Sequence, residues 1–181
     1  GQLADGQGGG VEVLGIGPGA HRGALLAVAL AARGDADGAV TLLEPLSRLE
    51  TPPGERARLL RCRLAQDWQG ILDFAAAHPR QAERDAELLG SVVRALAETG
   101  DVAGMVDFYE RSKPRIAGLT PRLLRDSIRL PYFAFSGQLE ATDRLFGQSF
   151  AGLPAISRAY WLATARLYGG EPDAARADFE R

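Results

Sequence analysis

Residues 97–111 read AETGDVAGMVDFYER, and this stretch decides the fold because versions of it recur along the chain. Similar stretches are ARGDADGAVTLLEPL at residues 32–46, FSGQLEATDRLFGQS at 135–149 and YGGEPDAARADFER at 168–181. Each version ends one apolar-periodic segment, passes through a glycine and one or two polar residues, and begins a second segment. Recurrence of this kind is the signature of a repeat protein.

The glycines of these versions mark turns between helices. They are Gly34, Gly100, Gly137 and Gly170. Glycine suits the position because it adopts a positive φ at a helix C-terminus without a Cβ clash. A further turn is expected around Asp67, in AQDWQGILDFAAAHP, where the glycine is missing. The turns are spaced by roughly 32 to 37 residues, which is the range of helix–turn–helix repeats.

The segments between the turns carry apolar residues at helical spacing, and no convincing strand alternation follows residue 16. Thr120 and Pro121 predict a helix start, with the threonine as N-cap and the proline at the first helical position. Pro131 falls inside an expected helix and should kink that helix or end it early. The sequence therefore predicts an all-α protein.

Composition excludes some classes of partner. The chain has 181 residues, of which 46% are hydrophobic, and this is enough to bury a core. Its formal net charge of −2 provides no basic field to attract nucleic acid or anionic lipid. The longest apolar runs are too short to cross a bilayer. We expect neither nucleic-acid binding nor membrane insertion by this segment.

The ends of the sequence suggest a fragment of a longer protein. The chain begins at Gly1, its one methionine is Met105, and it stops in PDAARADFER, which reads as a helix cut short. A single cysteine, Cys62, favours a reducing compartment without deciding between the cytoplasm and a bacterial periplasm. We expect a cytoplasmic segment, with tethering to a membrane through missing parts of the chain as the alternative.

The repeats resemble those of the tetratricopeptide (TPR) family from about residue 21 to residue 181. The resemblance implies a right-handed α-solenoid of about five stacked helix–turn–helix repeats over residues 20–181, after a glycine-rich lead-in at 1–19 that is extended or poorly ordered. The chain lacks the family's large aromatic residue early in the first helix of each repeat. The matching residues are Leu26, Ala27, Leu30, Ala39, Leu43, Leu46, Val92, Val93, Leu96, Met105, Tyr109, Thr142, Phe146, Pro154, Leu162, Ala163, Ala175 and Phe179.

A different interpretation starts from VEVLGIGPGAHRGALL. Gly15, Gly17 and Ala20 match the glycine pattern of a dinucleotide-binding turn, and Glu44 could follow on the next strand as the ribose ligand. However, Glu44 lies further along the chain than the usual spacing of about 20 residues. The would-be second strand also occupies the place of a second repeat helix. A nucleotide-binding enzyme built on Gly15–Ala20 is therefore the least favoured hypothesis.

No catalytic, metal or cofactor residues are predicted. Cys62 lies on an apolar helix stripe, and a buried core role is expected. His21 and His78 are the two histidines, and they are too far apart in the sequence to suggest a metal site. The carboxylates of Asp35, Asp37 and Asp126 lie at turns or on mixed-charge helices, where solvated side chains are the default.

Basic and aromatic residues supply the candidate binding site. Arg56 and Arg63 are seven residues apart in ERARLLRCRL and share a helix face. The repeat alignment places that face on the concave surface, near Arg94, where bidentate pairing could receive an acidic peptide or a carboxylate. Glu55, Asp67, Glu87 and Glu98 could neutralise these arginines. The expected partner-binding set is Arg56, Arg63, Arg94, Ser127, Tyr160 and Tyr168.

Stacked helix pairs form an extended surface, which favours the binding of a protein or peptide segment. Our first hypothesis is a non-catalytic protein–protein interaction domain, acting as a scaffold or regulator, whose partner could include the rest of its own chain. The alternative is the soluble regulatory domain of a larger membrane protein or enzyme, such as a rhomboid-type intramembrane protease. That alternative depends on architecture alone.

Overall fold

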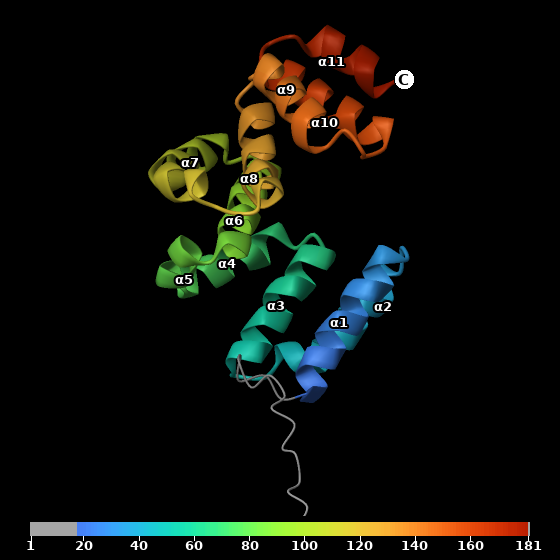
Figure 1. Ribbon diagram of the computed structural model, residues 1–181, viewed down its shortest axis with the longest axis vertical. Coiled ribbons are helices and arrows are strands. Elements are labelled where there is room, and N and C mark those ends of the chain that lie inside the picture. The colour runs from blue at the N-terminus through green and yellow to red at the C-terminus, as the bar shows by residue number, and fades with distance from the viewer. Residues whose placement is uncertain (1–17, 181) are drawn as a thin grey trace, which may run out of the picture. The chain divides into compact units, whose positions relative to one another are not determined.

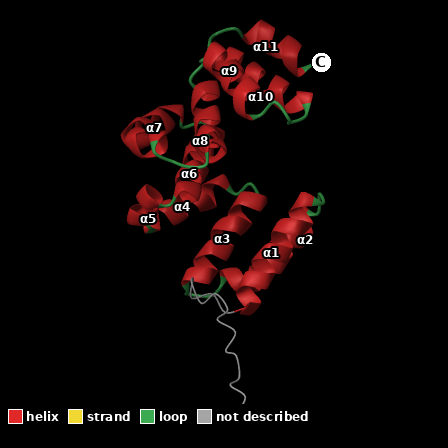
Figure 2. Ribbon diagram, in the orientation of Figure 1, coloured by secondary structure: helices red, strands yellow, loops and turns green. Residues whose placement is uncertain are grey.

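The computed structural model describes residues 18–180, and every regular element among them is an α-helix (Figure 2). The prediction of an all-α protein is therefore confirmed. Contacts divide the helices into two units, whose border in the sequence lies between Gln66 and Asp67. Unit 1 contains α1 (Pro18–Ala32), α2 (Ala36–Ser47) and α3 (Pro52–Leu64). Unit 2 contains α4 (Trp68–Ala77), α5 (Pro79–Arg84), α6 (Ala86–Glu98), α7 (Val102–Ala117), α8 (Arg122–Phe135), α9 (Leu139–Ser149), α10 (Ala155–Tyr168) and α11 (Pro172–Phe179).

The N-terminal glycine-rich segment lies mostly outside the described residues. Only Pro18 and Gly19 of the predicted lead-in are described, and they open α1. The nucleotide-binding alternative required a strand ending at Glu44. The residues around Glu44 instead form α2, because they continue an apolar helical stripe behind the Asp35 cap. The glycines at positions 15 and 17 lie outside the described residues.

The turn glycines have the backbone conformation that the sequence predicts. Their φ angles are 87° at Gly34, 83° at Gly100, 70° at Gly137 and 85° at Gly170. At the turn without a glycine, Gln66 adopts a φ of 53°. A glutamine therefore accepts the left-handed conformation in the second repeat, where side chains other than glycine are disfavoured.

Three of the turns continue into an aspartate that caps the next helix. Each carboxylate accepts a hydrogen bond from the backbone N–H three residues later, at 2.8 to 2.9 Å. The donor is always a glycine, whose missing Cβ leaves room for the carboxylate. Such caps satisfy backbone donors that have no partner inside the helix. The pairs are Asp35 with Gly38, Asp67 with Gly70, and Asp101 with Gly104.

Burial follows the same register around every turn. The fifth residue after each positive-φ residue is at most 1% exposed; these residues are Ala39, Ile71, Met105, Thr142 and Ala175. The seventh residue before it is at most 7% exposed; these residues are Ala27, Leu59, Val93, Leu130 and Ala163. The sequence repeat is thus also a repeat of buried positions.

Unit 1 packs α2 against both α1 and α3 around a small core. Its buried apolar residues are Ala27, Ala39, Leu43 and Ala57. Arg61 on α3 donates to Glu44 on α2 over 2.6 Å and ties the two helices together. The outer face of α1 is apolar, because Leu25, Leu26 and Val28 are each more than half exposed. The TPR resemblance matched Leu26 to the repeat pattern, but the structure leaves it outside the core.

Unit 2 places α6, α8 and α10 in contact in that order, and each packs against the helix that follows it (Figure 1). The short helix α5 is an insertion between α4 and α6, and both of these neighbours contact it. The largest fully buried side chains of this unit include Phe146, Met105, Ile116 and Ile128. Tyr132, Phe133 and Phe135 also pack in or against this core.

The expectation for the start of α8 is wrong. The helix begins at Arg122 rather than Pro121, because Pro121 has an extended ψ of 166° and takes the N-cap position itself. Pro131 does not end the helix, which continues to Phe135. Pro131 has no N–H to donate to the carbonyl of Ser127 four residues earlier. Pro131 is nevertheless among the buried residues of the helix.

Candidate partner-binding surfaces of unit 2

The six predicted binding residues fall in both units. Arg56 and Arg63 lie on α3 of unit 1, and both side chains are exposed. Arg94, on α6, belongs to unit 2. Arg56 and Arg63 thus belong to one unit and Arg94 to the other, and the expected strip of three arginines stays a prediction. The other candidates, on α8 and α10, lie in unit 2 with Arg94.

Arg94 sits between two tryptophan rings. Its guanidinium carbon lies 4.8 Å from the ring centre of Trp161 on α10 and 5.8 Å from that of Trp68 on α4. Arg94 Nε also donates to Glu98 Oε1 over 2.6 Å. These contacts join three helices of unit 2 through one side chain. The pairing with Glu98 neutralises Arg94, so the residue is not an unbalanced cation waiting for a carboxylate.

Tyr160 belongs to the same cluster. Its ring meets Trp161 edge-on at 5.2 Å and Phe179 at 6.3 Å. Burial raises the pKa of Tyr160, and the nearby Glu98 carboxylate raises it further. The structure thus brings together two predicted residues, Arg94 and Tyr160. Tyr168, at the end of α10, has its ring 5.1 Å from that of Phe135, and its charge interaction contributes to the raised pKa of Tyr160.

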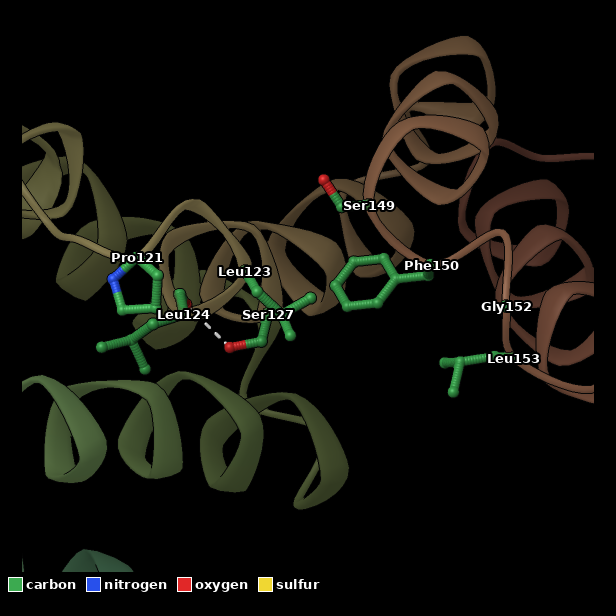
Figure 3. Close-up of a pocket in the computed structure, with 8 residues that line it drawn as sticks. All are labelled: Pro121, Leu123, Leu124, Ser127, Ser149, Phe150, Gly152 and Leu153. Carbon is green, nitrogen blue, oxygen red and sulfur yellow. Dashed lines mark hydrogen bonds between the residues drawn. The ribbon is translucent and has the colours of Figure 1, made fainter.

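Ser127 lines an apolar pocket on the surface of unit 2 (Figure 3). The cavity has a volume of about 570 Å³, within the usual range of ligand pockets. One wall comes from the start of α8, and the other comes from the end of α9 and the connection to α10. Figure 3 shows Phe150 and Leu153 facing the α8 residues across the opening. The lining residues are Pro121, Leu123, Leu124, Ser127, Ser149, Phe150, Gly152 and Leu153.

The buried carboxylate of Asp126 accepts hydrogen bonds at one edge of this pocket. Ser149 Oγ donates to Asp126 Oδ2 over 2.5 Å, and Arg122 Nε donates to the same oxygen over 3.0 Å. Asp126 is only 1% exposed, so the expectation of a solvated side chain is wrong for this residue. Two more guanidinium groups, of Arg125 and Arg129, lie within 3.7 Å of Asp126 Oδ1. Three arginines therefore surround one carboxylate.

The pKa of Asp126 reflects two opposing effects. Burial raises the pKa, since it disfavours the charged form. The hydrogen bonds from Ser149 and Arg122 and the charges of Arg122 and Arg125 lower it. The lowering effects prevail, so the pKa lies below its usual value and Asp126 is ionised at neutral pH.

Sequence reasoning missed most of these neighbours. Trp68, Trp161 and Asp126 come next to their partners only through packing between helices. The signal for Asp126 was present in RLLRDSIR, where arginines four before and three after one aspartate share its helix face. Phe150 and Leu153 lie in an aperiodic connection that gives no such signal.

The remaining chemistry-bearing residues do not form a site with one another. Cys62 is buried in α3, as expected for a core residue. The His78 ring stacks on Phe74 at 4.4 Å, and its Nδ1 lies 2.9 Å from the Phe74 carbonyl. Among residues 18–180, no group of three or more His, Cys, Asp or Glu side chains could hold a metal ion. The side chain of His21 lies outside what the structure describes.

Comparisons of the chain with family models, curated proteins and solved structures found no match. Among the described helices, none combines the length and the apolar composition needed to cross a bilayer.

Proposed function

We propose that this chain is a TPR-like helical-repeat module that binds a segment of a partner protein and performs no catalysis itself. The proposed architecture is a right-handed α-solenoid of about five helix–turn–helix repeats. The shared register of turns and buried positions supports this architecture, because one repeating unit then explains all five positive-φ residues.

The register also supports a common binding face. Arg56, Ser127 and Tyr160 each lie ten residues before the positive-φ residue of their repeat. Equivalent positions on stacked repeats face the same side of a solenoid. Within unit 2, Ser127 and Tyr160 are therefore expected to face the same side.

The apolar pocket beside Ser127 is the observation that carries the proposal. Leu123 and Leu153 are 54% and 48% exposed at the pocket, although large aliphatic side chains are usually buried. An apolar hollow lined by few polar side chains matches the anchor pockets of protein interfaces. Arg94 takes a supporting role in this proposal, since Glu98 already neutralises it.

A selection experiment tests the proposal. Peptides from a random displayed library are selected on the immobilised chain, synthesised with a fluorophore, and titrated by fluorescence anisotropy. Leu153→Asp should weaken the selected peptides by about tenfold or more, because it puts a charge into the pocket. Leu167→Asp is the matched control: Leu167 is also 48% exposed in unit 2, but it is not among the pocket residues. Equal affinity for both variants, or no enriched peptide, would contradict the proposal.

A further inference from the structure

We infer that the occupant of the pocket beside Ser127 is an amphipathic helix of a partner protein that carries acidic residues next to its apolar face. This inference deepens the proposed function and depends on it. It commits to the chemistry of the partner segment: bulky apolar side chains for the hollow and carboxylates for its basic edge.

The apolar half of the argument comes from the size and the walls of the pocket. The volume of about 570 Å³ exceeds what a single aliphatic side chain fills. The two walls place Leu123 opposite Phe150 and Leu153 (Figure 3). A helix presents two or three apolar side chains on one face, at spacings of three, four and seven residues. Such a face can fill a hollow of this size and cover the exposed leucines.

The charged half of the argument comes from α8. Three guanidinium groups, of Arg122, Arg125 and Arg129, contact the one carboxylate of Asp126. The cluster therefore keeps a net positive charge. Arg122 is the most exposed of the three, with 55% of its side chain accessible. A carboxylate on the partner would balance this excess charge.

The excess charge lies at the edge of the apolar hollow. Arg122 stands in the chain between the pocket residues Pro121 and Leu123. Its Nη2 donates to Gln148 Oε1 over 2.6 Å, and Gln148 precedes the pocket residue Ser149. Arg122 and Ser149 also share the same Asp126 oxygen. An apolar surface and a positive edge in this arrangement complement an acidic amphipathic helix.

Three synthetic helices test the inference on the full chain. They have the same Leu/Phe face and the same length of about 15 residues, or four turns. Their remaining positions near that face are Glu in the first, Gln in the second and Lys in the third. Fluorescence anisotropy at low salt should give the tightest binding for the Glu helix, by about tenfold over the Lys helix. Added salt should reduce the difference, because exposed charges are screened.

Variants assign the preference to the proposed residues. Arg122→Gln should reduce the ratio of Glu-helix to Lys-helix affinity, whereas Arg122→Lys should preserve most of it. Arg48→Gln is the matched control, because Arg48 also pairs with an acid four residues away but lies in unit 1. Far-UV circular dichroism of each variant shows whether the helices are intact. The Arg122→Lys variant keeps the test meaningful if Arg122→Gln disturbs Asp126.

The outcomes separate the two proposals. Equal binding of the three helices, with loss of all binding in Leu153→Asp, would overturn the acidic preference and leave the proposed function standing. Tighter binding of the Lys helix would also overturn the inference. Binding of none of the three, together with selected peptides that bind away from the pocket, would reject both. Tightest binding by the Glu helix, dependent on Leu153 and on the charge at Arg122, supports both.

Discussion

The guanidinium carbon of Arg94 lies 4.8 Å from the ring centre of Trp161, and this contact connects α6 to α10. Because Glu98 pairs with the same guanidinium group, the arginine contributes chiefly to the packing of unit 2. The sequence had suggested a cation that receives a partner's carboxylate. In the structure, three arginines of α8 lie around the single carboxylate of Asp126, and the most exposed of them is Arg122.

Truncation of this cluster should destabilise the protein. Trp161→Ala should lower the free energy of unfolding by about 3–5 kcal/mol, because a nearly buried indole is removed. Arg94→Ala should lower it by about 1–2 kcal/mol through loss of the stack. Urea unfolding followed by circular dichroism measures both. Arg48→Ala, which removes an exposed ion pair on unit 1, should have almost no effect. A stability for Arg94→Ala equal to that of wild type would show that the stack contributes nothing.

Gln66→Gly should stabilise the chain. Gln66 holds a φ of 53°, and glycine removes a Cβ penalty of about 1–2 kcal/mol. The greater freedom of glycine in the unfolded state offsets part of this, by about 0.4–1 kcal/mol. A net gain of up to about 1.6 kcal/mol is therefore expected from thermal and urea unfolding. The converse change, Gly100→Ala at a φ of 83°, should be destabilising. A stabilising Gly100→Ala would contradict the role assigned to the turns.

Loss of a repeat cap should also be measurable. Asp101→Ala removes the acceptor for the Gly104 N–H, and it should cost about 1 kcal/mol in the free energy of unfolding. Asp101→Asn keeps a side-chain oxygen and should retain most of the stability. Asp37→Ala serves as the control, because Asp37 is an exposed residue that caps no helix. The cap assignment fails if Asp101→Ala and Asp37→Ala have the same stability.

Asp126 should make stability depend on pH. Its pKa in the folded protein lies below the usual 3.8, so its stabilising effect is complete above that value and is lost as the pH falls through the folded pKa. Asp126→Asn should therefore be less stable than wild type at neutral pH, and the difference should shrink in acid. Urea unfolding of both proteins at about pH 7 and about pH 3 measures the change. A difference that is the same at both pH values would show that the charge of Asp126 is unimportant.

The parts of the fold that depend on local sequence could be predicted, and the parts that depend on packing could not. The glycines at positions 34 and 137 predict a positive φ, since few other residues adopt it. Gln66 gives no such signal in the sequence, yet it adopts a φ of 53°. Pro131 was expected to kink α8 or end it early, yet the helix continues past this buried residue to Phe135. Propensity is a weak guide where tertiary contacts compete with it.

The candidate site also has parts that could be predicted from the sequence and parts that depend on packing. Ser127 belongs to the expected partner-binding set, and the structure places Ser127 at a pocket. The opposite wall, with Phe150 and Leu153, comes from a connection with no periodicity. Asp126 looked solvated because its charged neighbours in the sequence are arginines, whereas Ser149, from the next helix, helps to bury it. These features depend on contacts between repeats, and such contacts could not be predicted from the single sequence.

The Arg94 cluster also determines what tryptophan fluorescence of this protein reports. The chain has two tryptophans, and both rings lie against the same guanidinium group. Intrinsic tryptophan fluorescence therefore reports on one place in unit 2, and unit 1 contributes no tryptophan signal. A fluorescence melt would miss separate unfolding of α1–α3, and a quenching titration would respond first to ligands that disturb Arg94.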